Sequence, residues 1–152
     1  MTPPLRIGIL GAARIAGRAV VEPARTLGHD VVAVAARDLG RAQAYAAEHG
    51  IAKAYGSYEE LIADPEIEAI YNPLPNHLHI PLTLQAARAG KHVLCEKPFS
   101  LTAAEAEQLR EVAGRVHIME AFMVRFHPQW QRVRELVRAG RIGTPRAVQV
   151  FF

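Results

Sequence analysis

The chain has 152 residues, half of them hydrophobic and 22% charged, a composition close to the globular average that excludes wholesale disorder. This length suits one domain with a core of its own. The net charge of +3 raises the expectation of an anionic ligand, but so mild a basic balance does not establish nucleic-acid binding. The single cysteine, Cys95, excludes an intrachain disulfide framework and a cysteine metal cluster.

The N-terminal sequence bears on the expected cellular location of the protein. Arg6 precedes an apolar stretch that resembles a signal peptide, but Arg14 and Arg18 interrupt it. No apolar run approaches the roughly 18 residues of a membrane span. We therefore expect a cytoplasmic protein with no membrane partner.

Short apolar runs alternate with helical patterns up to about residue 120. Six strands are predicted, over residues 5–10, 30–36, 53–55, 68–72, 91–95 and 115–119. The intervening helices are predicted over residues 14–22, ending near Pro23, then from Asp38 to Gly50, from Ser57 to Asp64, from about Asn76 to Ala89, and from Thr102 to Ala113. This alternation specifies a parallel sheet with helices on both faces. The predicted fold is α/β, a Rossmann-type doubly wound sheet.

The pattern changes after about residue 120. Pro128 is expected to open an amphipathic helix that Gly140 closes, and residues 147–152 are expected to begin another strand. The apolar stripe of this helix is predicted to comprise Trp130, Val133, Leu136 and Val137. We therefore expect a dinucleotide-binding domain over residues 1–120. Residues 121–152 are expected to form a connecting helix and the first strand of a second α/β domain that is truncated at the C-terminus.

The first strand leads into a turn of small residues. Gly11-x-Ala13-x-x-Ala16 follows the glycine fingerprint of dinucleotide-binding folds, with alanine in place of two glycines. Gly11 permits a tight turn, Ala13 lets a pyrophosphate approach the backbone, and the helix start supplies free N–H groups. Gly11, Ala13, Arg14 and Ile15 are thus candidate cofactor contacts. The alternative is a packing turn.

The end of the second strand bears on the choice of cofactor. An NAD site usually carries an acid about 20 residues beyond the fingerprint, but Ala36 and then Arg37 stand there. A guanidinium pairs well with phosphate, so we expect NADP to be preferred over NAD, with Arg37 as a contact. Alternatively, Asp38 binds the ribose or Arg37 is only a surface charge.

The loop after the fourth strand is Pro73-Leu74-Pro75-Asn76-His77-Leu78-His79. Ligands of open α/β sheets bind at such carboxyl-end loops, so Pro73, Leu74, Asn76 and His79 are candidate cofactor contacts. Asn76 is a plausible helix cap, and one histidine is expected to face the cleft. No third ligand is apparent beside the two histidines, so no metal site is expected.

Cys95-Glu96-Lys97-Pro98 ends the fifth strand. A lysine there can hold the cofactor ribose and protonate a substrate oxygen, with Glu96 beside it. Pro98 could fix a cis bond. The alternative is a solvated ion pair. Cys95 is expected to be a buried strand residue, because no base is spaced to activate it.

The segment that leaves the sixth strand contains Arg125-Phe126-His127-Pro128. Arg125 is a candidate for substrate or cofactor contact, and the alternative is an exposed arginine in a linker. Taken in order, the Gly11 turn, Pro75-Asn76-x-x-His79, Glu96-Lys97-Pro98 and this segment resemble the Gfo/Idh/MocA oxidoreductase family, in particular its dihydrodiol and xylose dehydrogenase-like branch. The similarity runs through the whole chain, and Glu-Lys-Pro is its most specific element.

The resemblance implies NAD(P)-dependent hydride transfer to or from a sugar, polyol, diol or related carbonyl, with Lys97 as the catalytic residue. It also implies a longer protein, because the family follows its Rossmann domain with an α/β substrate domain. We therefore expect the 152-residue chain alone to bind cofactor, to self-associate as a homo-oligomer and to be inactive. The alternatives are a non-catalytic dinucleotide-binding module or sensor, and a nucleic-acid binder, which the basic pI alone favours.

Overall fold

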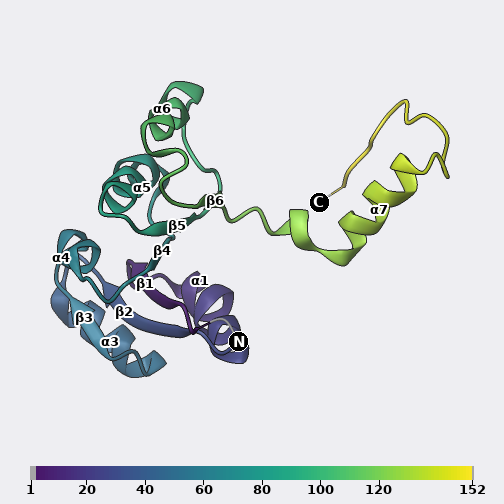
Figure 1. Cartoon of the computed structure of the whole chain (residues 1–152). Coiled ribbons are helices and arrows are strands. Elements are labelled where there is room, and N and C mark those ends of the chain that lie inside the picture. Colours follow the sequence, from purple (N-terminus) through teal and green to yellow (C-terminus); the bar gives the residue numbers. More distant parts are fainter. Residues whose placement is uncertain (1–2, 152) are drawn as a thin grey trace. The chain divides into compact units, whose positions relative to one another are not determined.

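The computed structural model describes residues 3–151. In this part of the chain, six parallel strands form one sheet in the order β3-β2-β1-β4-β5-β6 (Figure 1). The strands are β1 (Arg6–Leu10), β2 (Asp30–Ala35), β3 (Lys53–Tyr55), β4 (Ala69–Asn72), β5 (His92–Cys95) and β6 (Ile118–Glu120). Each begins or ends within a few residues of its predicted bounds, and the predicted doubly wound sheet is confirmed.

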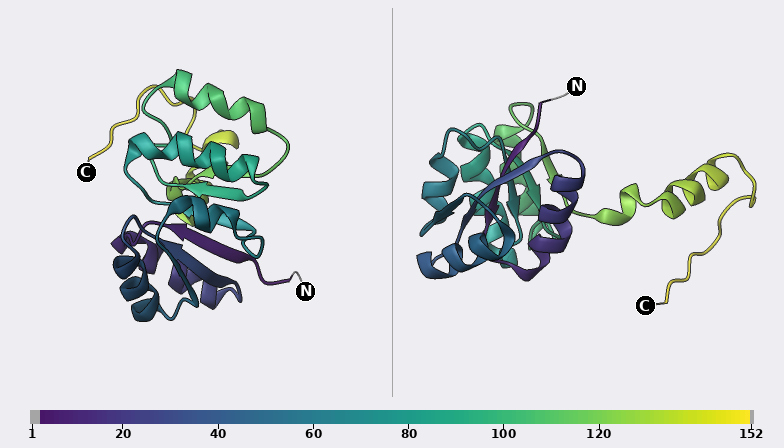
Figure 2. Two further views of the ribbon diagram at one scale, coloured as in Figure 1. Left: turned by 90° about the vertical axis from the view of Figure 1, so that its left-hand side faces the viewer. Right: turned by 90° about the horizontal axis from the view of Figure 1, so that it is seen from below.

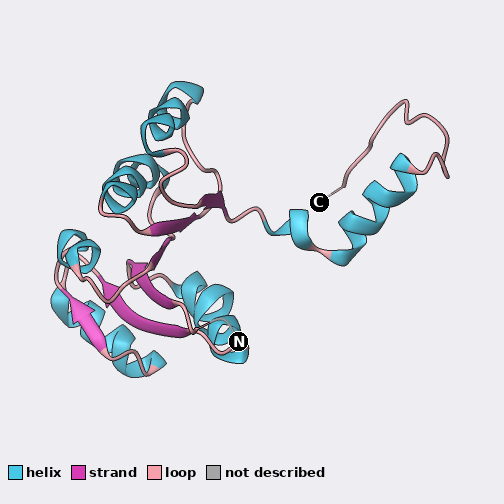
Figure 3. Cartoon of the chain, in the orientation of Figure 1, coloured by secondary structure: helices cyan, strands magenta, loops and turns pink. Residues whose placement is uncertain are grey.

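Helices cover both faces of this sheet (Figures 1 and 3). On one face, α1 (Arg14–Ala16), α2 (Glu22–Thr26) and α3 (Leu39–His49) belong to the layer that buries Ile9, Val34 and Tyr71. On the other, α4 (Tyr58–Ala63) and α5 (His79–Arg88) pack over Leu10, Ile70 and Val93. The turn after α6 (Ala103–Glu107), η3 (Gln108–Val112), packs beside α5.

Three of these helices begin at a side-chain cap, as predicted. Asp38 accepts a hydrogen bond from the Arg41 amide, Ser57 from the Glu60 amide and Thr102 from the Glu105 amide. Such caps satisfy amide groups that the first helical turn leaves without partners. The caps explain why these helices start where they do.

Residues 14–26 form one continuous helical run, so the prediction that this helix ends near Pro23 is wrong. Between α1 and α2 lies a π-helical segment, η1 (Gly17–Val21), in which the Glu22 amide donates to the Gly17 carbonyl. A proline has no N–H and disrupts an α-helix interior. The π segment changes the hydrogen-bond register, so that Pro23 lies in the first turn of α2, where the missing N–H does little harm.

The structure divides into two units after Ala121. The second unit, from Phe122 onward, contains η4 (Met123–Phe126) and α7 (Pro128–Arg138), which has Pro128 in its first turn. Residues 147–151 form no strand, contrary to expectation, because no strand of the described residues pairs with them. No helix in residues 3–151 is long and apolar enough to cross a membrane. Figure 2 gives two further views of the chain.

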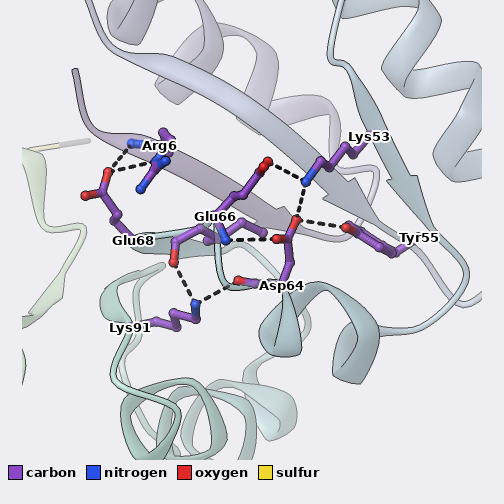
Figure 4. Close-up of polar contacts among 8 residues, drawn as sticks. Arg6, Lys53, Tyr55, Asp64, Glu66, Glu68 and Lys91 are labelled. Carbon is purple, nitrogen blue, oxygen red and sulfur yellow. Dashed lines mark hydrogen bonds and ion pairs between the residues drawn. The ribbon is translucent and has the colours of Figure 1, made fainter.

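A buried polar cluster lies at the amino edge of the sheet, where β3, β4 and β5 begin (Figure 4). Asp64 accepts hydrogen bonds from Lys53 Nζ at 2.9 Å, from the Tyr55 hydroxyl at 2.8 Å and from the Glu66 amide at 2.9 Å. The buried ammonium of Lys91 donates to the carbonyls of Asp64 and Ile67 at 2.8 and 2.7 Å. These bonds fasten the segment between α4 and β4 to the start of β5.

Candidate functional site

The strand order reverses between β1 and β4, and such a switch point is where open α/β sheets bind ligands. The turn after β1 and the loop after β4 touch each other here. Gly11 has a φ of +92°, and a Cβ added to it would lie 2.7 Å from Leu74 Cδ2. A side chain would be strained at this φ, so the position favours glycine; we call the packing of the Gly11 turn against the Leu74 side chain the Gly11 cradle.

The helical run that follows Gly11 begins at Arg14, and the Ala13 amide donates to the Gly11 carbonyl at 2.8 Å. Ala13 is its N-cap in an extended conformation and has no side-chain cap bond. The side chains of Arg14 and Ile15 are exposed. The first amides of a helix have no intrahelical acceptors, so this end can receive the oxygens of an anionic group. The Ala13 carbonyl is itself held by the hydroxyl of Tyr45 at 3.3 Å.

A hollow of about 490 Å³ lies beside this turn. Its walls come from the turns after β1, β2 and β4 and from the starts of α3 and α4. They comprise Gly11, Ala12, Ala13, Ala36, Arg37, Asp38, Arg41, Tyr58, Pro73, Leu74 and Pro75. The side chains of Arg37 and Arg41 form no ion pair with any residue in the described part of the chain, whereas one carboxylate oxygen of Asp38 is engaged by the Arg41 amide. Two free guanidinium groups therefore border the hollow.

His79 does not face a cleft. Its ring is 1% exposed, with Nδ1 2.8 Å from the Pro98 carbonyl and Nε2 2.7 Å from the Leu74 carbonyl. Both ring nitrogens therefore lie within hydrogen-bond distance of backbone carbonyls, one in the loop after β4 and one in the turn after β5. His79 is therefore not the histidine that was expected to face the cleft, because its ring ties the loop after β4 to the turn after β5.

The predicted cap at Asn76 is also wrong. Its side chain is exposed and caps neither the 3-10 turn η2 (Asn76–Leu78) nor α5. Because η2 begins at Asn76 itself, the residue lies inside the turn rather than before it. Asn76 remains a candidate cofactor contact by its exposure, and Pro73 and Leu74 by their place on the wall of the hollow.

The turn after β5 presents Lys97 at the carboxyl edge of the sheet. Lys97 is exposed, and the Lys97–Pro98 peptide bond is cis, as predicted. Glu96 is half-buried and accepts hydrogen bonds from the Tyr71 hydroxyl at 2.7 Å and from the Lys97 amide at 3.2 Å. The Glu120 carboxylate accepts from the Phe99 amide at 2.9 Å. The turn is therefore bonded on both sides of Lys97, whose ammonium has no partner among residues 3–151.

Cys95 lies beside these groups but has no part in their chemistry. The thiol is fully buried, and this burial raises its pKa to about 12. Thiolates rather than thiols are nucleophiles. The prediction of a buried strand residue is confirmed.

Arg125 belongs to the second unit, so its relation to the hollow is not determined. Within that unit it is exposed and lines a smaller hollow of about 230 Å³ with Trp130 and Arg134. Its contact with a cofactor stays a prediction.

Arg41, Tyr71 and Glu120 are among the residues of the site that were not predicted from the sequence. Arg41 could have been found from the sequence, because it is a second arginine, after Arg37, in the first turn of the helix that Asp38 caps. Tyr71 matches the pattern of an apolar strand residue, and nothing in the sequence shows that Glu120 reaches the Phe99 amide.

A small-residue turn at the switch point, an adjoining hollow with free guanidiniums and a lysine at the carboxyl edge together define a dinucleotide-binding Rossmann domain of the oxidoreductase type. Residues 5–126 match the family model described as "Oxidoreductase family, NAD-binding Rossmann fold". The chain belongs to this family, Gfo/Idh/MocA.

Relatives of known name and solved structure agree with this membership. The chain is 51% identical over 152 residues to an uncharacterized oxidoreductase, ORF334, of Rhizobium meliloti, covering 97% of this chain and 45% of the relative. It is 48% identical over 136 residues to D-xylose 1-dehydrogenase (NADP(+)) 2 of Haloferax volcanii, covering 88% and 42%. The structure of KijD10, a 3-ketoreductase from Actinomadura kijaniata in complex with NADP, superposes with a TM-score of 0.80 at 35% identity, covering 92% and 45%. The chain thus spans less than half the length of these relatives.

Proposed function

We propose that the chain is the cofactor-binding part of an NADP-dependent oxidoreductase that acts by hydride transfer on a sugar, polyol, diol or related carbonyl compound. The observation that carries this proposal is the hollow at the switch point, where the Gly11 cradle adjoins the free guanidiniums of Arg37 and Arg41. The relatives named for xylose oxidation and ketone reduction support the substrate class.

The residues of the hollow fit a phosphorylated dinucleotide. The Gly11 turn and the amides at the start of α1 would bind the pyrophosphate, because this turn lies on the wall of the hollow and no side chain caps the start of the helix. Arg37 and Arg41 would bind the phosphate on the adenosine ribose, which distinguishes NADP from NAD. The carboxylate of Asp38 is partly occupied as a helix cap, which favours the guanidiniums as the specificity groups.

Lys97 would act at the other end of the cofactor, at the end of β5. When bound, the nicotinamide supplies or accepts the hydride. The free ammonium of Lys97 would hold the ribose and carry the proton that joins or leaves the substrate oxygen. His79, Glu96 and Glu120 would support it by fixing the turn between Glu96 and Phe99.

Four finer features belong to the same proposal. Residues 122–152 would connect this domain to a substrate-binding part, and the chain would self-associate through apolar side chains such as Met123, Phe126 and Trp130, which are exposed within their unit. The partner would be a small-molecule substrate and not a nucleic acid. A cytoplasmic location rests on the sequence pattern of the N-terminal residues alone.

The proposal is tested by titrating the chain with NADPH and NADH in a calorimeter. NADPH should bind more tightly, and Arg37→Ala and Arg41→Ala should each weaken NADPH by about tenfold to a hundredfold while leaving NADH nearly unchanged. Arg110→Ala is a matched control, because Arg110 pairs only with Glu107 on the outer helix. Equal affinity for the two cofactors would contradict the NADP preference, and absence of binding would contradict the function.

A further inference from the structure

Tyr71 is a polar group that the proposed chemistry does not use. It is the penultimate residue of β4, its side chain is 1% exposed, and it packs among Ile9, Val34 and Tyr45 on one face of the sheet. Burial, and to a smaller extent the hydrogen bond to Glu96, raises the pKa of Tyr71 far above its usual range. The hydroxyl therefore stays protonated and serves as a permanent hydrogen-bond donor.

This hydroxyl donates to the side chain of Glu96, 2.7 Å away and one residue beyond the end of β5. The two residues lie on neighbouring strands, and the Glu96 amide donates to the Asn72 carbonyl at 2.9 Å, which extends the pairing of β4 with β5 by one step. Tyr71 donates to one carboxylate oxygen and the Lys97 amide to the other. Two donors in fixed directions leave the carboxylate a single orientation.

We propose that Tyr71 is a positioning residue for the nicotinamide half of the site: it sets the carboxylate of Glu96, and through it the start of the turn that presents Lys97. This inference rests on the proposed function, because it assigns the Glu96–Lys97 end of the site to the nicotinamide half. Tyr71 touches neither substrate nor cofactor, and it acts from within the core. Its effect should therefore be confined to ligands that reach this end.

Two ligands can distinguish an effect on the nicotinamide half of the site from an effect on the adenosine half. NADPH extends to both ends, whereas adenosine 2′,5′-bisphosphate carries only the adenosine half and its ribose phosphate. Tyr71→Phe removes one oxygen and keeps the ring that fills the core. We expect it to weaken NADPH binding by about three- to tenfold, the effect of one hydrogen bond, and to leave the bisphosphate affinity unchanged.

Tyr55→Phe is a matched control. Tyr55 also donates its hydroxyl to a carboxylate, Asp64, at 2.8 Å, but at the amino edge of the sheet. This variant should lower thermal stability without changing the affinity for either ligand. If Tyr71→Phe weakens both ligands alike, or neither, Tyr71 is only a core residue and the proposal is overturned. If the parent chain binds neither ligand, the proposed function fails instead.

A double-mutant cycle tests whether Tyr71 acts through Glu96. Glu96→Ala changes a half-buried surface residue and should weaken NADPH by at least as much as Tyr71→Phe. Adding Tyr71→Phe to Glu96→Ala should then change NADPH affinity by less than about twofold. Additive losses would show that Tyr71 acts by another route and would overturn the proposal.

Discussion

The two edges of one sheet use charged residues in opposite ways. At the amino edge, Asp64 and Lys91 are buried, and their charged groups are hydrogen-bonded within the cluster (Figure 4). At the carboxyl edge, Arg37, Arg41 and Lys97 are exposed and form no ion pair with any other residue from 3 to 151.

A charge whose partners lie within the fold contributes to stability and leaves nothing for a ligand, because a buried charge is costly unless it is paired or hydrogen-bonded. A charge without partners at the mouth of a hollow contributes little to stability and is free to bind an anion. The contrast separates residues that hold the fold from residues that serve function, even when they are of the same type and flank the same strand.

Lys97 and Lys91 flank β5 and make the contrast sharpest. Lys97→Ala should lower the rate by about 10²–10⁴ in any form of the protein that turns over, because a positioned proton donor is lost. The same change should alter the free energy of unfolding by less than about 0.5 kcal/mol. Steady-state kinetics and denaturant titration measure the two effects. Near-parent turnover would show that Lys97 is not catalytic.

Lys91→Met should have the reverse effect: it should lower the stability of the fold and leave cofactor binding unchanged. Methionine has a similar length but no donor, so the carbonyls of Asp64 and Ile67 would be left buried and without their bonds. We expect the variant to lose about 2 to 4 kcal/mol of stability. Its NADPH affinity, measured well below its unfolding temperature, should match the parent. A stable variant with impaired binding would contradict the division between the two edges.

Much of this arrangement could be predicted from the sequence, because strand periodicity, Gly11 and the helix caps are local. What could not be predicted depends on contacts between distant segments. The burial of His79 follows from two carbonyls, one of them 19 residues away, and Tyr71 meets Glu96 across 25 residues. Residues 147–151 have the composition of a strand, but a strand also needs a pairing partner, which composition does not reveal.

A fall in pH should destabilise the polar cluster at the amino edge of the sheet. Burial alone would raise the pKa of Asp64, but hydrogen bonds from Lys53, the Glu66 amide and Tyr55 outweigh it and lower the pKa from 3.8 to about 2. A lowered folded-state pKa means that ionised Asp64 stabilises the fold above about pH 4. This contribution, about 2 kcal/mol, is lost as the pH falls towards 2.

Unfolding measured in denaturant at several acidic pH values would show this loss. Asp64→Asn cannot ionise, so the variant should be less stable than the parent at neutral pH and should converge with it towards pH 2. A constant difference between the two proteins across this range would show that the Asp64 charge does not carry the effect.

Cys95 tests whether position at the carboxyl edge is enough to make a residue functional. It lies two residues from Lys97, yet it is fully buried, and its pKa is raised to about 12 by that burial. We expect the native chain to resist alkylation by iodoacetamide at neutral pH, with labelling that becomes fast only in denaturant. Cys95→Ala should lower stability by about 1 kcal/mol through a small cavity and should leave NADPH affinity unchanged. Rapid labelling of the native chain, or labelling that NADPH blocks, would place the thiol in the site. The difference between the two edges would then come from the position of a residue in the sheet. It would not come from whether the polar group of that residue is already paired or hydrogen-bonded within the fold.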